Sequence, residues 1–270
     1  MRNKLAVLGA GNMGLAIVDG IISSGVLSPE NIILVRRNTD KLSEYGKKGC
    51  TVSDDLLWAA KNADIILLAL KPQMMADLFS LIGESCEGKL AISIAAGIKV
   101  ETVEAALKGA SVVRVMPNTP LIVGEGVTQM CKGSTCSDED FDLAKSLFEG
   151  AGMTLVCKEE EINAFSVLTS SSVAFFAEVE EAMCNWALNN GLSGYDRKTI
   201  CDLISKTMSG SAALLYEKGY DPKALVKAVA SPKGSTERAL DVFEKDGLSE
   251  LFSKAMTASL KRNEELANLK

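Results

Sequence analysis

Short apolar runs alternate with longer amphipathic segments over the first 157 residues. Runs rich in Val, Ile and Leu are typical of buried parallel strands, and apolar residues at helical spacing are typical of helices that cover a sheet. Their alternation predicts βαβ units and a doubly wound, mostly parallel sheet. We predict strands at residues 5–8, 32–35, 65–70, 90–95, 112–115 and 154–157, and helices at 13–24, 74–82 and 139–149, the last behind a Ser137 N-cap.

The pattern changes near residue 160, because strand-like runs stop and apolar residues follow helical spacing to the C-terminus. We expect helices over 162–189 and 197–218, a short helix that Asp221 caps and Pro222 opens, and a final pair after Ser231 and Gly247. The prediction is therefore an α/β Rossmann domain over residues 1–159 and an all-α domain over residues 160–270.

Charge and composition exclude several classes of function. With 35 acidic and 29 basic residues, the formal net charge of −6 gives no field for holding nucleic acid, so we expect no nucleic-acid partner. The longest uncharged stretch, residues 162–177, contains Asn163, Ser166 and Thr169, so we expect no membrane-spanning segment.

The seven cysteines and the absence of histidine narrow the chemistry further. The cysteines are scattered and odd in number and include no Cys-x-x-Cys pair, so we predict no metal site and expect reduced thiols in a cytoplasmic protein. Without histidine, Ser-His-Asp, Cys-His and His-Glu-x-x-His chemistry is excluded.

The first predicted strand leads directly into Gly9-Ala10-Gly11-Asn12-Met13-Gly14, a G-x-G-x-x-G motif that opens a helix. Gly9 permits the tight turn, Gly11 lets a pyrophosphate approach the backbone, and Gly14 lets the helix pack closely on the strand. The N–H groups of the helix N-terminus, including those of Asn12 and Met13, favour phosphate. The motif predicts a dinucleotide site, and an ordinary glycine-rich turn is the alternative.

Arg36, Arg37 and Asn38 follow the second predicted strand, where an NAD-binding protein carries an acid for the ribose 2′-hydroxyl. A guanidinium binds a 2′-phosphate that an acid would repel, so the sequence predicts NADP (NADPH), with NAD as the alternative cofactor. The nearby Asp40 weakens the argument for NADP. The alternative is that these residues form a basic turn exposed to solvent and bind no ligand.

Later strand ends are expected at the same edge of the sheet, because ligands of doubly wound folds bind outside the carboxyl ends of strands. Each of these loops taken alone is equally typical of an ordinary βα connection. The further predicted cofactor-binding residues are Ala69, Leu70, Lys71, Pro72, Ala95, Gly97 and Asn118.

Two polar motifs lie in the second half. Ser231-Pro232-Lys233-Gly234-Ser235-Thr236 is a loop entering a helix, whose outward N–H groups suit a carboxylate; helix capping by Ser231 or Ser235 is the alternative. Thr169-Ser170-Ser171-Ser172 is a hydroxyl cluster of the kind that more often serves close packing or bonding to helix carbonyls.

Together these motifs resemble the pyrroline-5-carboxylate reductase family over nearly the whole chain. The resemblance rests on the glycine-rich turn, Leu70-Lys71-Pro72, Ser93-Ile94-Ala95-Ala96-Gly97, Arg114-Val115-Met116-Pro117-Asn118-Thr119-Pro120 and the loop from Ser231 to Thr236. It implies a Rossmann domain, a helical domain that forms a homodimer by interlocking helices, and an active site to which both contribute. Oligomers beyond the dimer stay open.

The resemblance also implies the reaction, which is the reduction of the cyclic imine 1-pyrroline-5-carboxylate to L-proline by NADPH. It implies that Ser231, Gly234, Ser235 and Thr236 bind this imino-acid substrate, with Thr236 as the catalytic residue that hydrogen-bonds the ring nitrogen. A substrate ring of five or six members is left open.

The chain departs from the family pattern at two places. It has Thr169-Ser170-Ser171-Ser172-Val173-Ala174-Phe175 where the family usually has Ser-Gly-Ser-x-Pro-Ala-Tyr. Lys233 replaces a glycine, and a cation there either strengthens anion binding or crowds the pocket. An NADP-binding sensor, or an imine reductase homologue with a drifted substrate pocket, is therefore the alternative function.

A second enzyme class shares the two-domain plan. β-Hydroxyacid dehydrogenases resemble it but use a lysine in the first long helix as general base. Residues 159–196 of this chain contain no lysine, arginine or histidine, which argues against alcohol oxidation.

Overall fold

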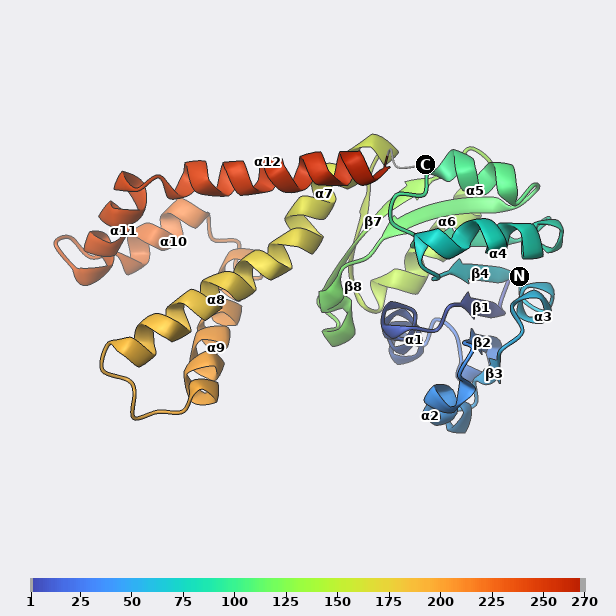
Figure 1. Cartoon of the computed structure of the whole chain (residues 1–270), viewed down its shortest axis with the longest axis horizontal. Coiled ribbons are helices and arrows are strands. Elements are labelled where there is room, and N and C mark those ends of the chain that lie inside the picture. The colour runs from blue at the N-terminus through green and yellow to red at the C-terminus, as the bar shows by residue number, and fades with distance from the viewer. Residues whose placement is uncertain (1, 268–270) are drawn as a thin grey trace. The chain divides into compact units, whose positions relative to one another are not determined.

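The computed structural model describes residues 2–267, and the side chains of residues 2–265. Contacts divide the chain into two compact units (Figure 1). The α/β unit comprises Met1–Ser170 and Leu260–Lys270, and the helical unit comprises Ser171–Ser259. This division comes later than the change of pattern at residue 160, because Ile162 is buried in the core of the α/β unit.

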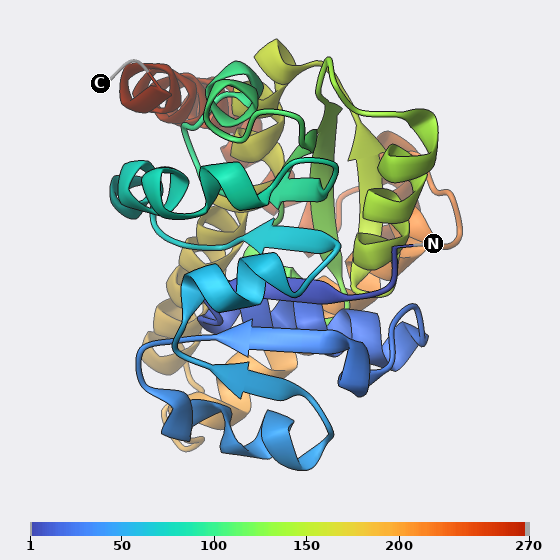
Figure 2. The ribbon, with the colours of Figure 1, turned by 90° about the vertical axis from the view of Figure 1, so that its right-hand side faces the viewer.

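One eight-stranded sheet forms the centre of the α/β unit, within the residues that the structure describes (Figure 2). Its order is β3-β2-β1-β4-β5-β6-β7-β8, and all neighbours are parallel except β6 and β7. This is the doubly wound order, whose switch point lies between β1 and β4. The strands are β1 (Leu5–Leu8), β2 (Ile32–Val35), β3 (Thr51–Ser53), β4 (Ile65–Leu68), β5 (Leu90–Ser93), β6 (Ser111–Met116), β7 (Gly126–Lys132) and β8 (Gly152–Val156).

Helices cover both faces of this sheet, and this explains why its central strands are apolar throughout. Leu5 and Val7 pack on one face with helices α1 and α6, whereas Ala6 and Leu8 pack on the other with α3, α4 and α5. The helices of this unit are α1 (Asn12–Ser24), α2 (Ser43–Lys47), α3 (Leu56–Lys61), α4 (Met75–Ile82), α5 (Val100–Ala106), α6 (Asp138–Glu149) and α7 (Ile162–Ser166).

The predicted fold class is confirmed, with differences in individual elements. Strands β4 and β5 end at Leu68 and Ser93, two residues before the predicted ends at 70 and 95, because the chain turns into loops there. Strands β3 and β7 and helices α2, α3 and α5 were not predicted. β3 has three half-buried residues, and β7 carries polar Thr128 and Gln129 within the sheet.

The helical unit has a small core of its own. Helices α8 and α9 pack around Cys184, Ala187, Ile200 and Ile204. Many of its large apolar side chains are exposed instead, including Phe176, Met183 and Trp186. Its helices are α8 (Ser172–Asn189), α9 (Arg197–Tyr216), α10 (Pro222–Val229), α11 (Ser235–Lys245) and α12 (Leu248–Ala267), the last of which ends in the α/β unit.

The helix predicted over 162–189 forms as one helical run with a π-helical turn at Val167–Ser171. By length and composition alone, the run Glu159–Asn189 is apolar enough to cross a membrane, although the uncharged stretch 162–177 had argued against any such segment. Only 17% of its most apolar window is buried here. An apolar helix face of this kind is equally typical of a protein–protein interface.

Candidate functional site

The turn after β1 contains three glycines, and the neighbours of Gly9 and Gly14 leave little room for a side chain. At Gly9, where φ is 107°, a Cβ would lie 2.7 Å from the Ala69 carbonyl oxygen, and at Gly14 it would lie 3.0 Å from the Gly9 oxygen. At Gly11 a Cβ would meet nothing nearer than 4.0 Å. The space in front of Gly11 is therefore open, and this fits a ligand that approaches the backbone there.

Helix α1 begins directly behind this open space. Gly11 is its N-cap and offers no side-chain cap, and the first helical bond runs from Leu15 N to Gly11 O. The N–H groups of Asn12, Met13 and Gly14 precede that bond and have no acceptor within the helix. An uncapped helix N-terminus behind an open glycine suits a pyrophosphate.

The end of β2 is joined to the glycine turn by hydrogen bonds. Ala10 N donates to Val35 O at 2.9 Å, and the Arg36 guanidinium donates to Ala10 O at 3.1 Å. The Asn38 side chain accepts from Asp40 N at 3.1 Å and caps the following 3₁₀ turn. Arg36 and Asn38 thus make bonds within the protein, whereas Arg37 is exposed and forms no ion pair within residues 2–267.

The loops after β4 and β5 reach the same edge. Ala69 N donates to Leu8 O at 2.9 Å, which places the loop of Leu70, Lys71 and Pro72 beside the glycine turn. Ala95 is buried, and Ile94 N donates to Leu68 O at 3.2 Å. The predicted cofactor residues from β1, β2, β4 and β5 therefore lie together at the carboxyl edge of the sheet.

Asn118, in the loop after β6, is buried, and its side chain forms hydrogen bonds within the protein. Its Oδ1 accepts from Val127 N, and its Nδ2 donates to Thr169 O, both at 2.8 Å. The neighbouring Gln129 donates from Nε2 to Thr169 Oγ1 at 3.0 Å. Gln129 was not singled out from the sequence, because its strand was not predicted.

A partly buried ion pair supports the loop that follows Gly97. Glu159 Oε1 accepts from Arg114 Nη1 at 2.6 Å and from Val100 N, the first residue of α5, at 2.8 Å. The Arg114 side chain is only 7% exposed, so removing its partner would leave a buried charge unpaired. No sequence pattern indicated that Glu159 contacts Arg114 and Val100, because these residues are far apart along the chain.

In the helical unit, the loop from Ser231 enters α11 as predicted, but without a serine cap. Gly234 is the N-cap and α11 has no side-chain cap, so the capping alternative for Ser231 or Ser235 is wrong. Gly234 N donates to Ser231 O at 2.9 Å, and a Cβ at Gly234 would lie 2.5 Å from Ser231 Oγ. The N–H groups of Ser235 and Thr236 at this end of α11 are therefore available to an anion, whereas that of Gly234 already bonds Ser231 O.

Lys233 and Thr236 flank this helix end. Lys233 is exposed and has a left-handed φ of 62°, and its N–H donates to Glu237 Oε2 at 2.6 Å. Thr236 lines a hollow of about 300 Å³ whose other walls include Leu215, Val226 and Leu240. A left-handed backbone such as that at position 233 is one that glycine adopts most readily.

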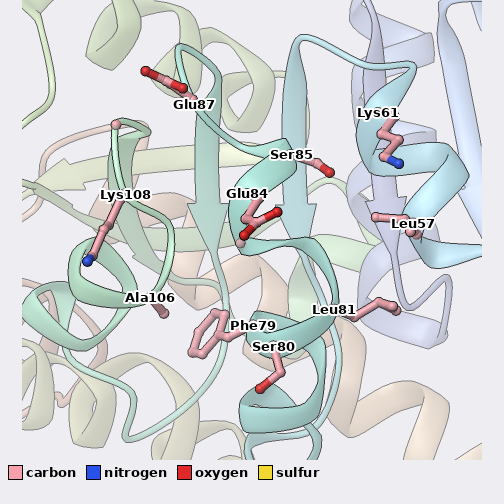
Figure 3. A pocket seen from close by; sticks show the side chains of 12 residues that line it. Leu57, Lys61, Phe79, Ser80, Leu81, Glu84, Ser85, Glu87, Ala106 and Lys108 are labelled. Carbon is pink, nitrogen blue, oxygen red and sulfur yellow. The ribbon is translucent and has the colours of Figure 1, made fainter.

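A larger hollow, of about 870 Å³, lies at the opposite edge of the sheet (Figure 3). Its walls come from segments that directly precede β4, β5 and β6, among them Lys61, Glu84 and Lys108. The predicted cofactor residues instead follow the carboxyl ends of the strands, and none of them lines this hollow. It is therefore separate from the candidate site.

The cysteines do not form a reactive centre. All seven are free, and burial raises the pKa of the Cys86 thiol to about 11. Burial, together with the neighbouring Cys157 thiol at 3.9 Å, also raises the pKa of Cys131. Over the described residues, no group of three or more His, Cys, Asp or Glu side chains is arranged to hold a metal ion.

A doubly wound sheet with an open glycine turn, followed by an all-helical unit, defines a two-domain nicotinamide-nucleotide oxidoreductase. Two family models agree with this class. A model described as NADP oxidoreductase, coenzyme F420-dependent, matches residues 4–97, and one described as pyrroline-5-carboxylate reductase dimerisation matches residues 159–266.

Full-length relatives identify the family. The chain is 35% identical to a pyrroline-5-carboxylate reductase of Methanosarcina acetivorans over 98% of both chains, and 34% identical to one of Haemophilus influenzae over the full length of both. A solved pyrroline-5-carboxylate reductase of Coxiella burnetii matches with a TM-score of 0.91 at 31% identity, covering 100% of each chain. The chain belongs to the pyrroline-5-carboxylate reductase family.

Proposed function

We propose that this protein reduces 1-pyrroline-5-carboxylate to L-proline with NADPH. The observation that carries the proposal is the full-length similarity to pyrroline-5-carboxylate reductases, joined to an intact glycine turn and an uncapped α11. A Plasmodium falciparum pyrroline carboxylate reductase was solved with NADP bound; at 23% identity and a TM-score of 0.87 it supports the fold alone.

The α/β unit would hold the nucleotide, which supplies the hydride for the imine carbon. The N–H groups of Asn12, Met13 and Gly14 would bind the pyrophosphate, and Gly11 would let it approach the backbone. The exposed guanidinium of Arg37 would bind the 2′-phosphate and so favour NADPH over NADH. The loops containing Ala69 and Ala95 would form the rest of the cofactor site.

The helical unit would hold the substrate carboxylate. The N–H groups of Ser235 and Thr236 stand at the start of α11, where the helix dipole favours an anion, next to the N-cap Gly234, whose own N–H bonds Ser231 O. The Thr236 hydroxyl would hydrogen-bond the ring nitrogen. A cyclic imine protonated on nitrogen is already electrophilic, so the protein mainly has to position it, which is consistent with a chain that lacks histidine.

We further propose a homodimer formed through the helical unit, in the cytoplasm. The dimerisation model covers residues 159–266. The apolar face of α8 is exposed in the single chain, and a second copy packed against it would bury this face. Seven free, mostly buried thiols suit a reducing compartment.

The test is imine-dependent oxidation of NADPH by the purified full-length protein. We expect Thr236→Ala to lower kcat/KM for the imine by about 100-fold, the usual scale for losing a positioned hydrogen-bonding group. Thr257→Ala, which removes an exposed hydroxyl bonded to Ser253 O on α12, is the matched control. Turnover by Thr236→Ala within about twofold of the wild type would refute the role of Thr236, and NADPH binding without any turnover by the wild type would favour a sensor.

A further inference from the structure

Two side chains, one from the loop after β6 and one from β7, hold the π-helical turn Val167–Ser171. A π-helical turn displaces the usual backbone bonds of a helix, so its polar groups need other partners. Asn118 Nδ2 donates to the Thr169 carbonyl at 2.8 Å, and Gln129 Nε2 donates to Thr169 Oγ1 at 3.0 Å. The same hydroxyl donates to Phe165 O at 3.0 Å. Thr169 is thus held through both its backbone and its side chain.

The same two side chains belong to the candidate cofactor edge. Asn118 lies two residues after the end of β6, and its Oδ1 fixes Val127 N at the start of β7. Gln129 pairs in register with Met116, the last residue of β6. Asn118 is 5% exposed and Gln129 is fully buried, so solvent does not compete for these bonds.

Two buried polar atoms at or beside the π-helical turn lack a hydrogen-bond partner. Gln129 Oε1 and Ser170 Oγ are buried and have no hydrogen-bond partner within the described residues. Buried polar atoms without partners are rare and mark places where a water or a ligand completes the bonding, or where strain is stored. Both lie at the π-helical turn or on the strand that holds it.

We propose that Asn118, Gln129 and Thr169 are positioning residues that couple occupancy of the cofactor edge to the order of the π-helical turn. A ligand that immobilises the loop after β6 also immobilises Asn118 and the paired Gln129 of β7, which hold Thr169 through its carbonyl and its hydroxyl respectively. The turn leads directly into α8, so cofactor binding stabilises the start of that helix. The inference rests on the proposed function, because it takes the ligand to be NADPH.

Hydrogen exchange of the full-length protein, with and without saturating NADPH, tests this coupling. In the wild type we expect NADPH to slow exchange about tenfold over residues 167–175 as well as over residues 9–14, as a change in local opening would do. Thr169→Val keeps the shape but loses the hydroxyl, and we expect it to retain slowing at 9–14 while losing most of it at 167–175.

Two variants complete the design. Thr169→Ser keeps the hydroxyl and restores the slowing at 167–175, whereas a merely steric role for Thr169 would not be rescued in this way. Ser146→Ala removes a comparable side-chain bond, to Leu143 O on α6, and behaves as the wild type. Gln129→Leu replaces Thr169→Val if the latter does not fold.

The outcomes separate the two proposals. If NADPH slows exchange at residues 9–14 of the wild type but not at 167–175, or if Thr169→Val and Gln129→Leu both behave as the wild type, the coupling is wrong and the proposed function is untouched. If NADPH slows exchange at neither segment of the wild type, the proposed cofactor, and with it the function, is wrong.

Discussion

Lys233 is the one non-glycine residue with a left-handed backbone among the described residues. It stands between Pro232 and the N-cap Gly234, in the loop proposed to hold the substrate carboxylate. A side chain at a left-handed position costs roughly 1–2 kcal/mol, and the bond from its N–H to Glu237 offsets part of that cost. Lys233 therefore brings a conformational cost as well as a positive charge to this loop.

We expect Lys233→Gly to raise the free energy of unfolding by about 0.5 kcal/mol, because relief of the left-handed strain exceeds the extra unfolded-state entropy of glycine. Thermal or urea unfolding at fixed protein concentration measures this, since an oligomer's stability depends on concentration. Lower stability in the variant would mean that the Lys233 side chain stabilises the loop by more than its backbone strains it.

Arg36 and Arg37 are adjacent in sequence but differ in what they contact. We expect Arg37→Ala to raise KM for NADPH by about 10- to 100-fold, because charge-assisted hydrogen bonds to phosphate are lost, and to leave KM for NADH nearly unchanged. Arg36→Ala is the comparison: it removes the bond to Ala10 O and so should weaken both cofactors alike. Steady-state kinetics gives the KM of each variant for NADPH and for NADH, to be compared with the wild-type values. An equal rise in both KM values for Arg37→Ala would rule out recognition of the 2′-phosphate by Arg37.

At the scale of elements, several helices begin with locally encoded signals. Ser137 accepts from Asp140 N at 3.1 Å and opens α6, whose first turn carries Asp138, Glu139 and Asp140. Asp196 and Asp221 cap α9 and α10 in the same way. By contrast, α1 and α11 begin at glycines without a side-chain cap, and these are the two helix ends proposed to bind anions.

We expect Ser137→Ala to lower the free energy of unfolding by about 1 kcal/mol, the usual cost of losing an N-cap bond. Ser146→Ala, on the same helix, should cost less than about 0.5 kcal/mol, because its hydroxyl bonds a carbonyl that is already within the helix. Denaturant unfolding of both variants makes the comparison. Equal losses would show that the cap contributes nothing beyond the loss of a hydroxyl.

At the scale of the whole molecule, the helical unit buries too little of its own apolar surface. Phe176, Val179, Met183 and Trp186 are spaced three and four residues apart, so they share one face of α8, and all four are exposed. Soluble monomers rarely leave such a face open, and the match of residues 159–266 to a dimerisation model supports the proposal that a second copy covers it.

We expect Trp186→Glu to shift the protein from dimer to monomer in light scattering, because a charge would be buried within the apolar face. Trp58→Glu is the matched control, since Trp58 is a partly exposed tryptophan of the α/β unit. A Trp186→Glu protein that stays dimeric would place the interface elsewhere.

Much of the fold could be predicted because its signals are local. The strands at 5–8 and 32–35 and the caps Ser137 and Asp221 depend on neighbouring residues, and the structure confirms them. Strand β7 escaped prediction because its polar Thr128 and Gln129 break the apolar run and its antiparallel pairing arises only in the sheet. The π-helical turn escaped because Asn118 and Gln129, which hold Thr169, lie 51 and 40 residues away along the chain.

The sequence by itself determined the glycine turn, the order of the elements, the loop from Ser231 to Thr236 and the family. These follow from residue types at short spacing, which local sterics and hydrogen bonding act on directly. Only the tertiary structure decided which polar side chains already form hydrogen bonds within the protein. Arg36 bonds Ala10, Asn118 bonds Thr169 and Val127, and Glu159 bonds Arg114. A hydrogen bond between distant segments depends on how the chain packs, and no local pattern records it.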